Sequence, residues 1–75
     1  MAKKIMQNIG GKDNVESVES CVTRLRLTLK DVSLVNESKI KQTGAAGVIK
    51  VGDHDIQIVI GTKVTYVLDA FNKLL

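Results

Sequence analysis

The chain has 75 residues, of which 44% are hydrophobic and 25% charged, with a formal net charge of +3. This composition is typical of one small globular domain and excludes a disordered tail. The charge is mild and the two aromatic residues lie apart from the basic ones, which argues against a nucleic-acid binder. Because no stretch reaches the roughly 18 apolar residues of a membrane span or resembles a secretory signal, we expect one soluble, cytoplasmic domain over residues 1–75.

The N-terminal segment is predicted to form a short helix. Ile5, Met6 and Ile9 lie at helical spacing, and Gly10-Gly11 should end the helix. Residues 12–14, Lys-Asp-Asn, are typical of a turn that leads into the first strand.

Two strands are predicted next, over Val15 to Ser20 and over Thr23 to Leu29. The second strand alternates cleanly, which is typical of a strand with one buried and one solvated face. The buried face carries Leu25, Leu27 and Leu29, and the solvated face carries Arg24, Arg26 and Thr28.

A connection over Asp31 to Asn36 is predicted to precede a second helix from Glu37 to Gln42. Asn36 is suited to be its N-cap, Ile40 should point inward, and Gly44 should end it.

A β-hairpin is predicted from Ala46 to Val51 and from Asp55 to Ile60, around Gly52-Asp53-His54. Its second strand should bury Ile56, Ile58 and Ile60, with Gln57 and Val59 on the opposite face. A last helix follows Gly61, with Thr62 as its cap. Its apolar stripe comprises Val64, Val67, Leu68, Phe71 and Leu75.

The predicted order is therefore α-β-β-α-β-β-α. Short links between sequential strands favour a four-stranded antiparallel sheet, and one apolar face per strand leaves room for helices on one side only. We expect an α+β fold, an open-faced two-layer sandwich. Its open face should carry Arg24, Arg26 and Gln57.

The lone cysteine is the first candidate for chemistry. A single cysteine in a small domain is most often a buried hydrophobe. Cys21, however, lies at a predicted connection among Ser20, Thr23, Arg24 and Arg26, which are unusual neighbours for an inert thiol. The thiolate is the nucleophilic form of cysteine and positive charge favours it, while the amides of such a turn can bind an anion.

The two arginines extend this hypothesis. Alternating charge usually marks a solvated strand face, but residues two apart on a strand lie about 6.6 Å apart on the same face. Guanidinium groups at that spacing can converge on one phosphate. With the Thr23 hydroxyl as a weaker candidate donor, Cys21, Arg24 and Arg26 predict a covalent phosphoryl site on sulfur.

Other site chemistries fit less well. One cysteine and one histidine cannot supply the four ligands of a structural zinc site, so no metal or cofactor is expected. A Cys–His dyad would need His54, which lies in a predicted hairpin turn. Gly44-Ala45-Ala46-Gly47 matches the Gly-x-x-Gly loop of KH domains, but here it joins a helix to a strand rather than two helices.

Taken together, the motifs make the chain similar to the IIB domain of the bacterial phosphoenolpyruvate-dependent sugar phosphotransferase system, glucose-type superfamily. The resemblance runs from Ile9 to Phe71, with Val15 in place of the usual Ile. It rests on Gly10-Gly11-Lys12-Asp13-Asn14-Val15, Cys21-Val22-Thr23-Arg24-Leu25-Arg26, Lys30-Asp31, Gly44-Ala45-Ala46-Gly47-Val48 and Gln57-Ile58-Val59-Ile60-Gly61-Thr62.

The resemblance implies that Cys21 accepts a phosphoryl group from a phosphohistidine of a IIA domain. It would then pass the group to a sugar hydroxyl in a membrane IIC domain. Arg24 and Arg26 would assist, and Val22, Thr23 and the backbone of residues 21–24 would cradle the phosphate.

Gln57 and Asp31 match family positions too, although Asp31 is equally suited to brace a turn. The isolated domain is expected to be monomeric and to work at the inner face of the membrane, either fused to the other domains or freestanding. Residues 44–48 lean toward the glucose, N-acetylglucosamine and maltose branch. A IIB-like regulatory module that docks on a partner without passing phosphate is the alternative function.

Overall fold

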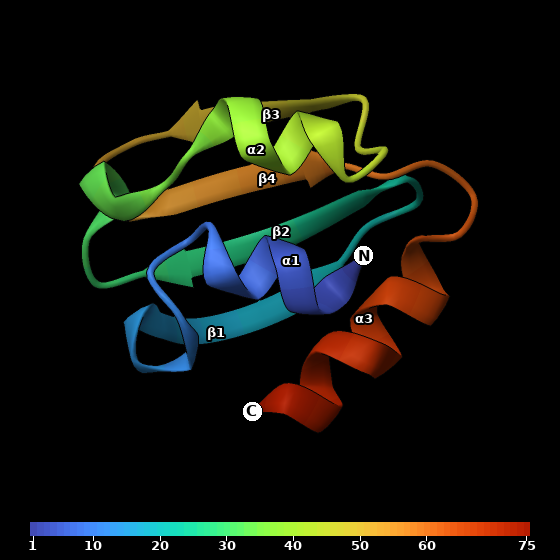
Figure 1. The fold of residues 1–75 in the computed structure, drawn as a ribbon, viewed down its shortest axis with the longest axis horizontal. Coiled ribbons are helices and arrows are strands. Elements are labelled where there is room, and N and C mark those ends of the chain that lie inside the picture. The colour runs from blue at the N-terminus through green and yellow to red at the C-terminus, as the bar shows by residue number, and fades with distance from the viewer.

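Four strands form one antiparallel sheet in the order β1-β2-β4-β3 (Figure 1). The computed structural model describes residues 1–75. Its strands are β1 (Val15–Ser20), β2 (Arg24–Leu29), β3 (Gly47–Val51) and β4 (Asp55–Val59). The two central strands, β2 and β4, are those with the clearest alternation of apolar and polar residues.

Three helices complete the fold: α1 (Ala2–Gln7), α2 (Glu37–Gln42) and α3 (Val64–Leu74). Two 3-10 turns precede β1 and α2, at Lys12–Asn14 and Val32–Leu34. Figure 1 shows α1 and α2 lying over the sheet, with α3 beside α1 along β1. The predicted α+β class and the order α-β-β-α-β-β-α are therefore confirmed. None of the three helices is long and apolar enough to cross a membrane.

The core lies between the sheet and the helices. The β2 leucines face it almost completely, with exposed fractions of 0% for Leu25, 2% for Leu27 and 0% for Leu29. They are joined by Ile56 and Ile58 of β4, and the helices add Ile5, Ile40, Val64, Val67 and Phe71. The core also includes Ala2 and Met6, so it begins before the segment from Ile9 that carries the family resemblance.

Two of the predicted helix ends are confirmed and one is wrong. The Asn36 side chain accepts a hydrogen bond from the Lys39 amide at 3.1 Å, and Gly44 follows α2 with a φ of 105°. Thr62 is not the cap of α3, because the helix begins at Val64 after Lys63. The Val64 amide donates to the Gly61 carbonyl. This carbonyl takes the place of the Thr62 side-chain oxygen as the hydrogen-bond acceptor at the start of the helix.

Two apolar residues predicted to be buried at the ends of elements are partly exposed. β4 ends at Val59 rather than Ile60, and Ile60 is half-buried. The Ile60 amide donates to the Thr23 carbonyl, which turns the chain away from the β3–β4 ladder. At the C-terminus, Leu75 lies beyond α3 and is 52% exposed, so the predicted apolar stripe ends at Phe71.

Asn14 is the one polar residue that the core buries, with 5% of its surface exposed. Its side-chain amide donates to the carbonyls of Ile9 at 2.7 Å and Asp31 at 2.9 Å, and its oxygen accepts from the Asp31 amide at 2.9 Å. The residue predicted as part of a turn therefore joins the end of α1, the start of β1 and the end of β2.

Candidate functional site

Cys21 lies in the tight turn between β1 and β2 and is exposed to solvent. Its amide donates to the Arg24 carbonyl at 2.9 Å, one step beyond the paired residues Ser20 and Leu25. Because strand residues alternate between faces, Cys21 belongs to the same face as Arg24, opposite the buried leucines. The interpretation of this cysteine as an inert core residue is therefore wrong.

The turn is attached to the connection between β4 and α3. The Thr23 carbonyl accepts hydrogen bonds from both the Ile60 and Gly61 amides, each at 2.9 Å. Gly61 has a φ of 105°, which is readily adopted only by glycine and brings two successive amides to one acceptor. The Cys21 turn is thereby held in position although its side chains are exposed.

The backbone cradle suggested by the sequence is only partly available. The Cys21 amide is engaged with Arg24 in the turn, so it is not free to bind a phosphate. The amides of Val22 and Thr23 donate to no backbone or side-chain acceptor, and the Thr23 hydroxyl makes no hydrogen bond. Two turn amides and one hydroxyl thus remain as unused donors next to the thiol.

Arg24 and Arg26 both lie exposed on the open face of the sheet. The Arg24 Nη1 donates to Gln57 Oε1 at 2.9 Å, from β2 to β4. Arg26 lies between Glu19 of β1 and Gln57 of β4 in the register of the sheet. It forms no ion pair, because the single ion pair of the structure joins Lys50 and Glu37 at 3.8 Å.

The structure thus brings together Cys21, Val22, Thr23, Arg24 and Gln57, with Arg26 one position further along the same face. An arginine has five N–H donors, of which Gln57 occupies one at Arg24. The other donors of Arg24, and all those of Arg26, make no hydrogen bond or ion pair within the chain.

The Cys21 turn is an open surface, because Cys21 lines none of the three cavities of the structure. A shallow cavity of about 220 Å³ does lie on the open face of the sheet, where Glu19, Arg26 and Gln57 are among its lining residues. An exposed nucleophile outside any cavity is accessible to another protein, whereas sites for small molecules usually enclose their ligand.

Asp31 is not part of this group of residues. It follows the far end of β2, where its carboxylate accepts hydrogen bonds from the Ser33 hydroxyl at 2.6 Å and the Ser33 amide at 2.9 Å. These bonds, helped by the nearby His54, lower the pKa of Asp31 below its ordinary value. In this structure Asp31 caps the turn at Val32–Leu34.

His54 lies at the same far end. Its Nδ1 lies 3.0 Å from the Leu29 carbonyl, and its own carbonyl accepts from the Leu29 amide at 2.7 Å. Because a carbonyl can only accept, Nδ1 carries the proton of this hydrogen bond. His54 therefore lies in the hairpin turn, as the sequence predicted, at the opposite end of β2 from Cys21.

Comparisons with known proteins agree with the fold and with the position of the motifs. A family model described as phosphotransferase system, EIIB, matches residues 3–36. The N-acetylglucosamine-specific EIIB component of Streptomyces coelicolor is 51% identical over 61 residues, which cover 81% of this chain and 78% of that protein.

Longer relatives contain a similar segment. The N-acetylglucosamine-specific EIICB component of Bacillus subtilis and the maltose-specific EIICB component of Escherichia coli are each 44% identical, over 83% and 95% of this chain. The chain spans only 14% and 13% of these two relatives.

A solved structure has the same fold. One domain of the IIabc component of the phosphotransferase system from Clostridium difficile superposes with a TM-score of 0.81 at 30% identity. The match covers 96% of this chain and 75% of that domain.

Proposed function

Since the chain belongs to the EIIB family of the sugar phosphotransferase system, we propose that it is a phosphoryl carrier with Cys21 as the residue that is phosphorylated. The observation that carries the proposal is the exposed thiol in a turn with two free amides, which leads directly into the exposed strand position of Arg24. The donor would be the phosphohistidine of a IIA domain, and the acceptor a sugar hydroxyl in a membrane IIC domain.

In the first step the Cys21 thiolate attacks the phosphorus of the phosphohistidine. The S–P bond forms as the P–N bond breaks, and the imidazole leaves with the electron pair of that bond. Phosphoryl transfer requires the protein mainly to position groups and to stabilise charge on the three equatorial oxygens. The free amides of Val22 and Thr23 and the guanidinium groups are suited to those oxygens.

Gln57 orients the Arg24 guanidinium in this proposal. Its Oε1 accepts from Arg24 Nη1, which holds the guanidinium in one orientation before the phosphate arrives. An arginine that is already positioned loses less conformational freedom when it binds the phosphate. Gln57 is therefore proposed as a positioning residue rather than a catalytic one.

In the second step a sugar hydroxyl attacks the phosphorus and the S–P bond breaks, which returns the thiolate. The hydroxyl proton passes to a general base at the acceptor site. The phosphorylated side chain carries about −1.5 to −2 charges at neutral pH, which is more negative than the thiolate, and this change favours exchange of one partner for the next.

The partners and the location follow from the same proposal. Residues 1–75 would act as one domain at the cytoplasmic face of the membrane, attached to or docked on IIC. Fusion of EIIB to other components in the EIICB relatives supports this arrangement. Two relatives are specific for N-acetylglucosamine and one for maltose, which supports a sugar of that kind as the final acceptor.

The test is intact-mass measurement after incubation with a phosphorylated IIA domain. The wild-type chain is expected to gain one phosphate, and Cys21→Ser is expected to gain none. Since Cys21 is exposed, the substitution should change the free energy of unfolding by less than about 0.5 kcal/mol.

His54→Gln serves as the control for a nucleophile elsewhere in the chain, and it should accept phosphate like the wild type. Phosphate on Cys21→Ser would refute the assignment to sulfur. A wild-type chain that binds phosphorylated IIA without taking up phosphate would identify the regulatory docking module instead.

A further inference from the structure

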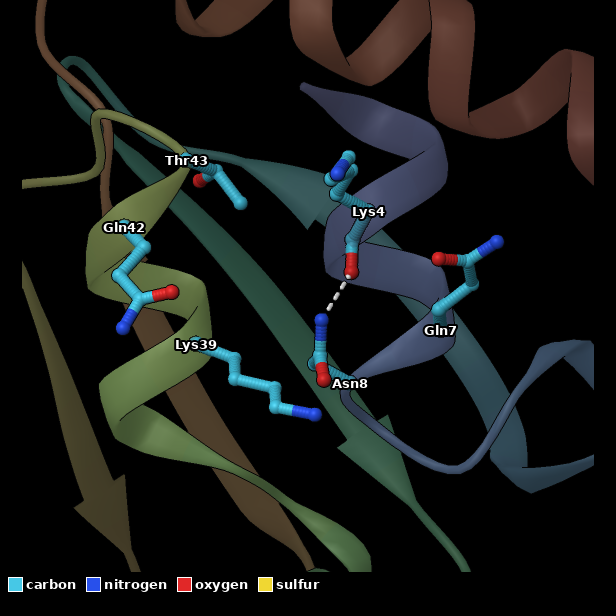
Figure 2. A pocket seen from close by; sticks show the side chains of 6 residues that line it. All are labelled: Lys4, Gln7, Asn8, Lys39, Gln42 and Thr43. Atoms are coloured by element: carbon cyan, nitrogen blue, oxygen red, sulfur yellow. Dashed lines mark hydrogen bonds between the residues drawn. The ribbon is translucent and has the colours of Figure 1, made fainter.

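A polar groove lies between α1 and α2 on the helical side of the molecule, remote from the open face of the sheet (Figure 2). Its volume is about 530 Å³, and none of its lining residues is hydrophobic or acidic. The lining residues are Lys4, Gln7, Asn8, Lys39, Gln42 and Thr43.

The two walls of the groove have nearly the same sequence. Residues 4–8 read Lys-Ile-Met-Gln-Asn and residues 39–43 read Lys-Ile-Lys-Gln-Thr. Each isoleucine is fully buried beneath its helix, and each Lys, Gln and Asn or Thr lines the groove. Each copy separately has the pattern of an ordinary amphipathic helix, so the repeat becomes apparent only when the two helices are seen to form one groove.

The two helices run in opposite directions and are held at both ends. The amide of Asn36, the N-cap of α2, donates to the carbonyl of Asn8, the C-cap of α1, at 2.8 Å. At the other end, Gly44 lies close to the Met1 side chain, since a Cβ atom added to Gly44 would lie 3.3 Å from Met1 Cε. This arrangement relates the two walls by an approximate twofold axis, so Lys4 lies near Thr43 and Lys39 near Asn8 (Figure 2).

The charge of the groove has no partner within the chain. Neither lysine forms an ion pair, since the one ion pair of the structure joins Lys50 and Glu37. The side chains of Gln7 and Gln42 make no hydrogen bond, and Asn8 uses only its Nδ2, which donates to the Lys4 carbonyl at 2.8 Å. The opposite directions of the helices also cancel much of the negative dipole that a helix C-terminus would bring.

We propose that this groove binds a small phosphomonoester that carries hydroxyl groups, such as a sugar phosphate. Two ammonium groups on opposite walls match the charge of a phosphomonoester, which is about −1.5 to −2 at neutral pH. The carboxamides provide donors and acceptors for ligand hydroxyls, and the Thr43 hydroxyl, which donates its proton to the Ile40 carbonyl at 2.6 Å, provides an acceptor. A neutral sugar is disfavoured, because the groove has no aromatic or aliphatic surface on which a sugar ring could pack.

The size of the groove agrees with this class of ligand, since small-molecule sites occupy about 300–1,000 Å³. The groove is independent of the chemistry proposed at Cys21, because Cys21 is not one of its lining residues. A chain that carries no phosphate on Cys21 is therefore expected to bind the ligand equally well.

The experiment is an NMR titration of the ¹⁵N-labelled chain with glucose 6-phosphate at low ionic strength. We expect amide shifts to concentrate at residues 4–8 and 39–43, with weak, millimolar affinity. The double variant Lys4→Gln/Lys39→Gln should weaken binding by at least about fivefold, because it removes both positive charges that line the groove.

Lys3→Gln/Lys41→Gln is the matched control. It removes the same charge from the same two helices, but neither residue lines the groove. It should change the affinity by less than about twofold, as expected for screened surface charges outside the site. Binding should also weaken below about pH 6, where a phosphomonoester gains a proton.

Three results would overturn the proposal. The first is equal weakening by the two double variants, and the second is a set of shifts confined to the turn at residues 21–24. The third result concerns lipids. Because a phosphate can also be part of a lipid headgroup, the chain is also tested with vesicles of phosphatidylglycerol. Binding to the vesicles without any response to glucose 6-phosphate would exclude a soluble ligand.

Discussion

Polar residues lie at both ends of β2, but at one end their side chains are hydrogen-bonded within the chain and at the other end most are not. At the far end Asn14, Asp31 and His54 direct their polar atoms to backbone groups of the chain. At the near end Cys21 and Arg26 have no side-chain hydrogen bond, and Arg24 has one. About 16 Å of strand separates the two ends.

This contrast separates residues that hold the fold from residues that are available for a partner. A buried polar group is stabilising only when its hydrogen bonds are satisfied, which describes Asn14. An exposed group with unused donors contributes little to stability and remains free for a ligand, which describes Arg26. The comparison therefore assigns stability to the far end and the proposed phosphate chemistry to the near end.

The largest expected effect belongs to the far end. Asn14→Ala should destabilise the domain by about 2–4 kcal/mol, because it leaves two carbonyls and one amide without their partner. Urea denaturation followed by circular dichroism measures the change.

Asn72→Ala is the control, an asparagine on the exposed side of α3 whose side chain makes no hydrogen bond, and it should be nearly neutral. A loss below 1 kcal/mol for Asn14→Ala, on the order of one ordinary hydrogen bond, would show that the far end does not depend on this side chain.

A smaller effect is expected at the near end, on transfer rather than on stability. Gln57→Ala frees the Arg24 guanidinium, so phosphate uptake from phosphorylated IIA should slow by about tenfold, the size of a typical charge-assisted hydrogen bond. Quenched-flow sampling with intact-mass detection gives the rate.

Thr28→Val is the matched control on the same face of the sheet. It removes the bond from the Thr28 hydroxyl to Asp55 at 2.8 Å, at the end remote from Cys21. An equal rate loss in both variants would mean that the open face acts as a whole and that Gln57 does not position Arg24 in particular.

The smallest effect concerns the pH dependence of stability at Asp31. Its folded-state pKa is lowered below 3.8, chiefly by the Ser33 hydroxyl and amide. The ionised form is therefore favoured by folding, so its contribution is present at neutral pH and is lost as the pH falls below 3.8.

Asp31→Asn should accordingly be less stable than the wild type at pH 6, and the difference should shrink as the pH falls below 3.8. Urea denaturation over a series of pH values from 6 downward tests this. A difference that stays constant with pH would assign the effect to packing rather than to the charge of Asp31.

The sequence predicted the fold well because its strongest signals are local. Strict alternation in Arg24–Leu29 and Asp55–Val59 requires one buried face, and the Asn36 side chain and Gly44 mark the ends of α2 by local geometry. The prediction for Thr62 was wrong because the Val64 amide at the start of α3 donates to the Gly61 carbonyl, and Gly61 itself is bound to Thr23, which is remote in sequence.

The residue types of the candidate site, and the order in which they occur, are determined by the sequence alone. Cys21, Arg24 and Arg26 lie within six residues, and alternation along one strand already places the arginines on one face. Only the tertiary structure decides which further groups join them. It brings Gln57 to Arg24 through the pairing of β2 with β4, and it places Asp31 at the far end.

The groove between α1 and α2 depends on tertiary structure in the same way, since its two walls lie 35 residues apart in the sequence. Short-range periodicity reports which face of an element is buried. It carries no information on which exposed faces meet, because that depends on how the elements pack over the shared core.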